Sequence, residues 1–217
     1  MSQAARIKIA KRVAQELKNG QIVNLGVGIP TLIPDYLDEK EVFLHSENGV
    51  LGIGPTPPED EIDMDLISAS KKPITMKKGA SLFDSAQSFA MIRGGHIDVA
   101  VLGALQVDET GEIANWAVPG KDILGVGGAM DLVTGAKEII LALTHLSKGN
   151  ASKLVRELSY PSSGFRKVNM VITEKAVFRF HEGKMILVEI DPEISVEELR
   201  EITDARFEVS ENLLNFA

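Results

Sequence analysis

Apolar residues near the start of the chain recur at the spacing of a helix. Between residues 2 and 18 they lie three or four positions apart, so one face of the segment is apolar and the pattern predicts a helix. These residues are Ile7, Ala10, Val13, Ala14 and Leu17. The Asn-Gly pair at 19–20 is typical of a helix end. Short apolar runs at 21–25 and 42–45 predict two strands.

The middle of the chain contains apolar runs that predict the centre of a sheet. Residues 98–103 and 137–143 are almost continuously apolar, as in parallel strands that are covered on both faces. A helical pattern at 82–92 ends before a Gly-Gly pair. The stretch 53–65 is rich in proline and acidic residues and predicts an exposed excursion.

The last part of the chain alternates strand-like and helical patterns. Runs at 169–173, 177–180 and 185–190 predict strands, and the last two form a hairpin. Ser195, with Glu198 three positions later, is a capping box that opens a helix to residue 202. Strands that alternate with helices predict one α/β domain over residues 1–217, with an open, mostly parallel sheet flanked by helices.

Charge and composition exclude several classes of protein. The net charge of the 217 residues is −8, and no basic stripe suits a nucleic acid. No apolar run approaches the roughly 20 residues of a membrane span, and the start lacks the apolar core of a signal peptide, so we expect a cytoplasmic protein. The chain has no cysteine, which excludes disulfides and a thiol nucleophile. The four histidines lack metal-ligand spacing, and no metal site is predicted.

Glu47 is the principal candidate for chemistry. It follows the apolar run at 42–45 and precedes the turn pair Asn48-Gly49. Ligands of open α/β sheets bind beyond the carboxyl ends of strands, where this carboxylate would lie. A carboxylate can act as a nucleophile when the acyl donor is already activated, as a thioester is. The same residues are also typical of a plain polar turn.

Two glycine-rich segments also follow predicted strands. Gly125-x-Gly127-Gly128 could bring backbone amides close to a ligand or an oxyanion, or could form only a tight loop. Gly26-x-Gly28 lacks the third glycine of the dinucleotide fingerprint, which argues against a nicotinamide cofactor.

Four segments together resemble a known family. The chain is similar to the β subunit of class I (3-oxoacid) CoA-transferases over about residues 7–209, and most similar to the butyrate–acetoacetate type. The segments are Asn-Leu-Gly-Val-Gly-Ile-Pro-Thr at 24–31, Ser-Glu-Asn-Gly-Val-Leu-Gly at 46–52, Ile-Arg-Gly-Gly-His at 92–96 and Gly-Gly-Ala-Met-Asp-Leu at 127–132.

The resemblance implies a fold, a reaction and a partner. The fold would be that of the CoA-transferase superfamily, similar to the NagB/RpiA type. Glu47 would form a glutamyl-CoA thioester and pass CoA between a short-chain acyl-CoA and an acid such as acetate, butyrate, acetoacetate or succinate. Coenzyme A would be a substrate, with no permanently bound cofactor, and a separate α subunit would complete the site. Residues expected to bind CoA are Gly26, Gly28, Asn48, Gly49, Lys71, Gly127, Gly128 and Ala129.

The chain departs from the family pattern at two places, and three alternative functions stay open. His45 stands where relatives often have glutamine, and Tyr-Pro-Ser-Ser-Gly at 160–164 stands where many have Leu-Pro-Leu-Thr-Gly. The same scaffold could serve 3-oxoadipate or another dicarboxylate, or hydrolyse the thioester. A non-enzymatic α/β sensor of a sugar phosphate or nucleotide is a further alternative, although it would leave the Glu47 motif unexplained.

Overall fold

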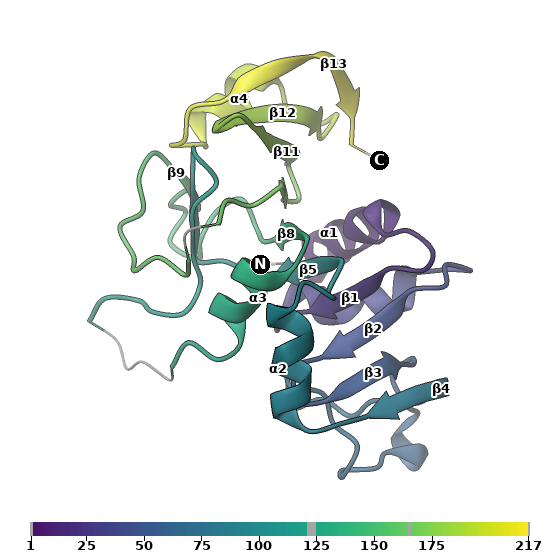
Figure 1. Cartoon of the computed structure of the whole chain (residues 1–217). Helices are drawn as coiled ribbons and strands as arrows, with labels where there is room; N and C mark the ends of the chain where they lie inside the picture. The colour runs from purple at the N-terminus through teal and green to yellow at the C-terminus, as the bar shows by residue number, and fades with distance from the viewer. Residues whose placement is uncertain (1, 121–124, 165, 217) are drawn as a thin grey trace.

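The computed structural model describes residues 2–120, 125–164 and 166–216. Its main feature is a ten-stranded sheet in the order β13-β12-β11-β10-β8-β5-β1-β2-β3-β4 (Figure 1). The centre of this sheet is parallel. It consists of β2 (Phe43–Ser46), β1 (Ile22–Leu25), β5 (Val99–Leu102), β8 (Glu138–Ala142) and β10 (Met170–Ile172).

Antiparallel pairs lie toward both edges of the sheet. Beyond β2, the strands β3 (Val50–Ile53) and β4 (Met76–Leu82) continue as antiparallel neighbours. Beyond β10, β11 (Ala176–His181) and β12 (Lys184–Ile190) are antiparallel, and β13 (Glu208–Asn215) runs parallel to β12. The predicted α/β class with a mostly parallel sheet is confirmed, and the antiparallel edges refine it.

Helices cover both faces of the parallel centre. In β5, Val99 belongs to the apolar cluster under α1 and η1, and the next residue, Ala100, belongs to the cluster under α2 and α3. Successive residues therefore point to opposite covered faces, which is why the strand is continuously apolar in sequence. The helices are α1 (Gln3–Glu16), the 3-10 helix η1 (Ile29–Tyr36), α2 (Ser85–Arg93) and α3 (Ala129–Gly135).

The remaining elements lie outside these layers. A short 3-10 helix, η2 (Glu59–Glu61), lies in the segment before β4, and α4 (Val196–Glu201) follows β12. The predicted capping box of Ser195 and Glu198 is present at the start of α4. A separate three-stranded sheet has the order β7-β6-β9, with β6 (Gln106–Asp108), β7 (Ile113–Ala114) and β9 (Leu154–Val155).

Most predicted elements are confirmed to within a few residues. Ser2 caps α1 by accepting a hydrogen bond from the Ala5 amide at 3.2 Å. The predicted helix at 82–92 begins too early, because Leu82 ends β4 and Asp84 caps α2 through the Gln87 amide at 2.8 Å. Strands β3, β4, β13 and the small sheet were not predicted.

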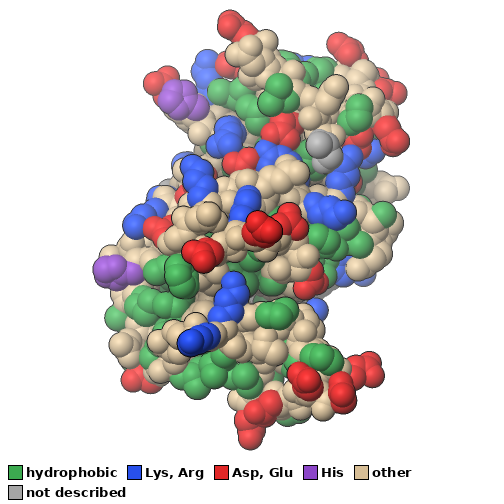
Figure 2. Space-filling view, turned by 90° about the vertical axis from the view of Figure 1, so that its right-hand side faces the viewer, with side chains coloured by type: hydrophobic (Ala, Val, Ile, Leu, Met, Phe, Trp, Pro, Cys, Tyr) green, Lys and Arg blue, Asp and Glu red, His purple; other side chains and the backbone are tan. Residues whose placement is uncertain are grey.

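The predicted acidic excursion is partly confirmed. Residues 59–65 are exposed, whereas Ile53 and Gly54 are buried against the sheet. Figure 2 shows acidic side chains gathered at the lower end of the molecule, where Figure 1 draws the segment leading into β4. Along the described parts of the chain, none of the helices combines the length and apolar character that a bilayer crossing requires.

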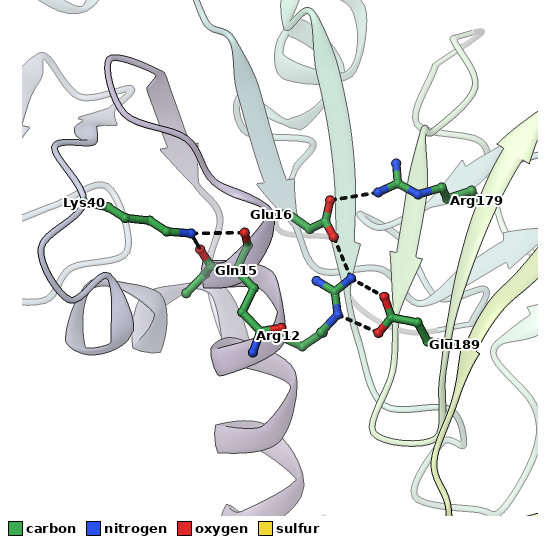
Figure 3. Close-up of polar contacts among 7 residues, drawn as sticks. Arg12, Gln15, Glu16, Lys40, Arg179 and Glu189 are labelled. Carbon is green, nitrogen blue, oxygen red and sulfur yellow. Dashed lines mark hydrogen bonds and ion pairs between the residues drawn. The ribbon is translucent and has the colours of Figure 1, made fainter. Parts of the chain in front are cut away.

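A buried ionic network joins α1 to the distant half of the sheet (Figure 3). The guanidinium of Arg12, 6% exposed, donates to Glu189 of β12 at 2.7 Å and to Glu16 of α1 at 2.6 Å. Glu16 also accepts from Arg179 of β11 at 2.9 Å. This network holds the N-terminal helix against strands that are more than 160 positions away in sequence.

Candidate active site

Glu47 lies in the tight turn that joins β2 to β3, and its side chain is half-buried. Gly49 shapes this turn with a φ of +116°. A Cβ at Gly49 would come within 1.9 Å of the Phe83 carbonyl oxygen, so only glycine fits. The Gly49 amide donates to the Ser46 carbonyl at 3.0 Å, and the Gly49 carbonyl accepts from the Phe83 amide at 3.0 Å. The turn is therefore held on both sides, and Asn48 is exposed beside it.

A buried amide lies behind the Glu47 carboxylate. Asn24 of β1 is fully buried, and its Nδ2 donates to Oε2 of Glu47 at 3.2 Å. The same nitrogen lies 3.1 Å from Nδ1 of His45, its partner in the β1–β2 register. Asn24 thereby contacts the neighbouring strand and the turn that follows it. Its Oδ1 is buried and has no hydrogen-bond partner among the described residues.

His45 continues this line of contacts into the helical layer. Its Nε2 lies 3.0 Å from Oγ of Ser88 on α2, and its ring stacks on Phe83 with centroids 6.1 Å apart. The ring is 1% exposed, and this burial lowers its pKa to about 4 because the charged form is poorly solvated. The imidazole is therefore neutral at physiological pH.

The second glycine segment meets Glu47 from the other side. A Cβ on Gly128 would lie 3.4 Å from Cγ of Glu47 and 3.2 Å from Cζ of Phe89, so this backbone approaches the carboxylate side chain closely. Gly127 has a φ of +55° and open space around it, and Ala129 begins α3. These residues, far from Glu47 in sequence, thus lie in its immediate neighbourhood.

The first glycine segment lies at the same edge of the sheet. The Gly26 amide donates to the Val101 carbonyl of β5 at 2.8 Å, and continuing the β1–β2 register brings Gly26 level with Glu47. Gly28, with a φ of +100°, turns the chain into η1. Val27 between them is 68% exposed. The carboxyl ends of β1 and β2 therefore form one rim, as the strand-end argument predicted.

Lys71 lies in a segment that packs against the Glu47 turn. Asn48 Nδ2 donates to the Ile67 carbonyl at 2.8 Å, and the Ala69 amide donates to Oγ of Ser46 at 2.8 Å. Lys71 is exposed, with a φ of +60° in the turn that follows. The neighbouring Lys72 lines a cavity of about 170 Å³ next to Ser46. The segment is thus near Glu47, while the Lys71 side chain points into solvent.

The sequence did not reveal every residue of this neighbourhood. Asn24 carried one signal, since it is the polar residue inside the short apolar strand Ile22–Leu25. Ser88 and Phe89 carried none, because only the packing of α2 brings them to the site. Within the described ranges, no three His, Asp or Glu side chains gather closely enough to hold a metal ion.

Comparison with known proteins gives a consistent result. The coenzyme A transferase family model matches residues 6–201. One subunit of a probable succinyl-CoA:3-ketoacid coenzyme A transferase of Bacillus subtilis is 51% identical over 97% of this chain and 98% of its own length. The β subunit of the acetate CoA-transferase of Escherichia coli K12 is 50% identical over 96% of each chain.

A solved structure shares the fold at lower identity. It is an acyl-CoA transferase of E. coli O157:H7 in a thioester complex with CoA, with a TM-score of 0.78 and 24% identity. The match covers 98% of the present chain and 43% of that longer one. The family model spans nearly the whole sequence, and the two relatives are similar over nearly their full lengths. The chain therefore belongs to the coenzyme A transferase family.

Proposed function

We propose that this chain is the nucleophile-bearing β subunit of a CoA-transferase, and that Glu47 carries CoA as a glutamyl thioester between two half-reactions. The observation that carries the proposal is the placement of the Glu47 carboxylate. It lies at the carboxyl end of a central strand, bonded by Asn24 at 3.2 Å and bordered by the backbone of Gly128. A carboxylate in this position can attack an acyl donor that is already activated.

The first half-reaction transfers CoA to the protein. A Glu47 oxygen attacks the thioester carbonyl of the acyl-CoA, the carbon–sulfur bond breaks, and an acyl-glutamyl anhydride and CoA thiolate result. The thiolate then attacks the glutamyl carbonyl, which breaks the anhydride and releases the acid as its carboxylate. The thioester bond is conserved, and no oxidant or reductant is needed.

The second half-reaction is the reverse with another acid. The incoming carboxylate attacks the glutamyl thioester, and CoA thiolate leaves as the second anhydride forms. The thiolate then attacks the acyl carbonyl, giving the new acyl-CoA and free Glu47. Backbone amides in the Gly127–Gly128 segment would stabilise the oxyanions of these steps, a contribution of a few kcal/mol per donor in comparable sites.

The remaining predicted residues receive roles in binding CoA. Asn48 and Gly49 would present the carboxylate, and Gly26 and Gly28 would border the CoA on the same rim as Glu47. Lys71 would reach the CoA phosphates by turning its exposed side chain across the 66–72 segment. Ala129 follows the glycine pair and fixes where α3 begins.

Substrates and partner follow from the relatives. Their names include succinyl-CoA, 3-ketoacids and acetate, so we propose short-chain acyl-CoAs such as acetoacetyl-CoA or butyryl-CoA, with acetate, butyrate, acetoacetate or succinate as acids. Both relatives are named as one subunit of an enzyme. We propose a separate α subunit that completes the site in a cytoplasmic heteromer.

The test is the mass of the intact chain in complex with its α subunit. Acetoacetyl-CoA without an acceptor acid should add one CoA at Glu47, and acetate or butyrate should discharge it. Glu47→Gln should abolish the adduct, while Glu41→Gln, two residues before the start of β2, should retain it. An assembled complex that binds acyl-CoA and forms no adduct would overturn the proposal.

A further inference from the structure

A continuous line of buried polar contacts leads from α2 to the Glu47 carboxylate. Ser88 Oγ lies 3.0 Å from His45 Nε2, His45 Nδ1 lies 3.1 Å from Asn24 Nδ2, and this nitrogen lies 3.2 Å from Glu47 Oε2. Ser88 and Asn24 are 0% exposed, and His45 is 1% exposed. The line crosses three elements and ends at the candidate nucleophile.

The chemistry of the donors fixes the direction of every hydrogen bond in this line. A side-chain amide nitrogen donates two hydrogens and accepts none. Asn24 Nδ2 therefore donates one hydrogen to Glu47 and the other to His45 Nδ1. The His45 Nδ1 must then be the unprotonated nitrogen, so the ring proton lies on Nε2 and is donated to Ser88. Turning the Asn24 amide over would place its oxygen against the Glu47 carboxylate, which also only accepts.

We propose that His45, in its neutral Nε2–H form, is a positioning residue that orients the Asn24 amide toward the Glu47 carboxylate. Among the described residues no hydrogen bond joins His45 to Glu47 directly, so His45 acts through Asn24. The inference rests on the proposed role of Glu47 and deepens it by naming the groups that hold the nucleophile.

Asn24 depends on His45 because little else holds its amide. Oδ1 of Asn24 has no partner among the described residues, so the hydrogen bonds of Nδ2 alone define the rotation of the group. In the described part of the chain, no other side chain donates a hydrogen bond to Glu47. Loss of the His45 acceptor frees the amide to rotate, and the carboxylate then loses its one side-chain donor.

Two substitutions of His45 separate positioning from stability. His45→Leu keeps an apolar volume but removes the acceptor at Nδ1. His45→Asn is smaller and polar, so it should destabilise the fold more than leucine. Its side-chain oxygen, however, reaches about as far from the backbone as Nδ1 and can accept from Asn24. The two variants should therefore rank in opposite orders for stability and for acylation of Glu47.

The experiment measures single-turnover formation of the glutamyl-CoA adduct in the complex with the α subunit. We expect His45→Leu to slow this step by ten- to about a hundredfold, as displaced reacting groups do, with little change in KM for acyl-CoA. His45→Asn should recover much of the rate despite a lower urea midpoint. A rate for His45→Asn at or below that of His45→Leu overturns the inference, and so does a wild-type rate in His45→Leu.

His145 provides a matched control. It is 0% exposed, and its ring lies between Thr203 Oγ1 at 2.8 Å and Thr173 Oγ1 at 3.2 Å, with no contact to Glu47. His145→Leu and His145→Asn should lower the urea midpoint and leave the acylation step unchanged. If the His45 variants and the His145 variants slowed acylation equally, the slowing would reflect lost stability rather than positioning, and the inference would be overturned.

Failure of the proposed function has a different signature. If the wild-type complex forms no adduct, the role of Glu47 fails, and the inference falls with it. If the wild-type complex forms the adduct but the acylation rates of the His45 variants rank in the same order as their urea midpoints, only the inference fails. Should both His45 variants fail to fold, Ser88→Ala, in a helix that tolerates alanine, removes the acceptor for Nε2–H. A slower step at constant KM then supports the inference, and a wild-type rate overturns it.

Discussion

Mild acid should destabilise this protein through its two buried histidines. The rings of His45 and His145 are 1% and 0% exposed, and burial lowers the pKa of each to about 4. For His145, burial is the larger cause, and the positive charge of Lys175 supplies part of this lowering of the pKa. The perturbation is a shift from pH 7 to pH 5, where both rings stay neutral in the folded protein but become charged once the chain unfolds.

The sign and size of the effect follow from proton linkage. Between the folded pKa of about 4 and the ordinary value of 6.5, the unfolded chain binds more protons, so stability rises with pH. The stability that the two neutral rings supply is fully present above about pH 6.5 and is lost as the pH falls toward 4. At pH 5 the loss is about 2 kcal/mol per histidine, or roughly 4 kcal/mol for both. That is a large part of the roughly 5–15 kcal/mol that keeps a domain folded.

Urea titration of the purified chain at the two pH values measures this loss. His145→Leu should be less stable than wild type at pH 7 and should lose only about half as much between pH 7 and pH 5. His181 is exposed, so the His181→Leu variant should lose as much stability between pH 7 and pH 5 as the wild type. The carboxylates whose pKa is lowered, including Asp98 and Asp191, titrate below this window. An undiminished loss in His145→Leu would refute the reasoning.

Three further predictions test the geometry of the site and of the fold. Gly49→Ala places a Cβ 1.9 Å from a backbone oxygen and should cost about 2–3 kcal/mol in urea titration; an unchanged midpoint would contradict the turn geometry. Arg12→Met leaves Glu189 nearly buried and unpaired and should cost about 3–5 kcal/mol, and adding Glu189→Leu should restore most of this stability. Gly128→Ala, whose Cβ would lie 3.4 Å from Cγ of Glu47, should slow transfer about tenfold, and an unchanged rate would contradict this close approach.

The sequence predicted the elements whose burial is complete. Strand β5 and, after Glu138, strand β8 are apolar because helices cover both of their faces, and such runs stand out in any sequence. Strand β4, in contrast, reads Met-Lys-Lys-Gly-Ala-Ser-Leu and is almost wholly exposed. It is a strand only because β3 pairs with it. Strand β13 likewise depends on pairing with β12, which no local pattern records.

The candidate site was predictable where one local rule was sufficient. A carboxylate directly after an apolar strand indicates the carboxyl edge of a sheet, and this argument placed Glu47. The neighbours of Glu47 depend on distant pairings. Asn24 reaches it through the β1–β2 register, and Gly128 through the packing of α3, 81 positions later in the sequence. Local patterns do not contain that information.

The two buried histidines differ in where their hydrogen-bond networks end. The two hydroxyls that contact His145 also lie within hydrogen-bond distance of backbone carbonyls, Thr203 of Leu199 at 2.6 Å and Thr173 of Ala176 at 3.1 Å, so the neighbours of this ring are groups of the fold itself. The network of His45 stays open, because it ends at a half-buried carboxylate and leaves Asn24 Oδ1 without a hydrogen-bond partner among the residues that the structure describes. An unpaired buried acceptor costs about 1–3 kcal/mol, and selection for stability alone would favour an apolar residue there. A fold that keeps such a group directly behind a carboxylate has the local inconsistency expected of a working site.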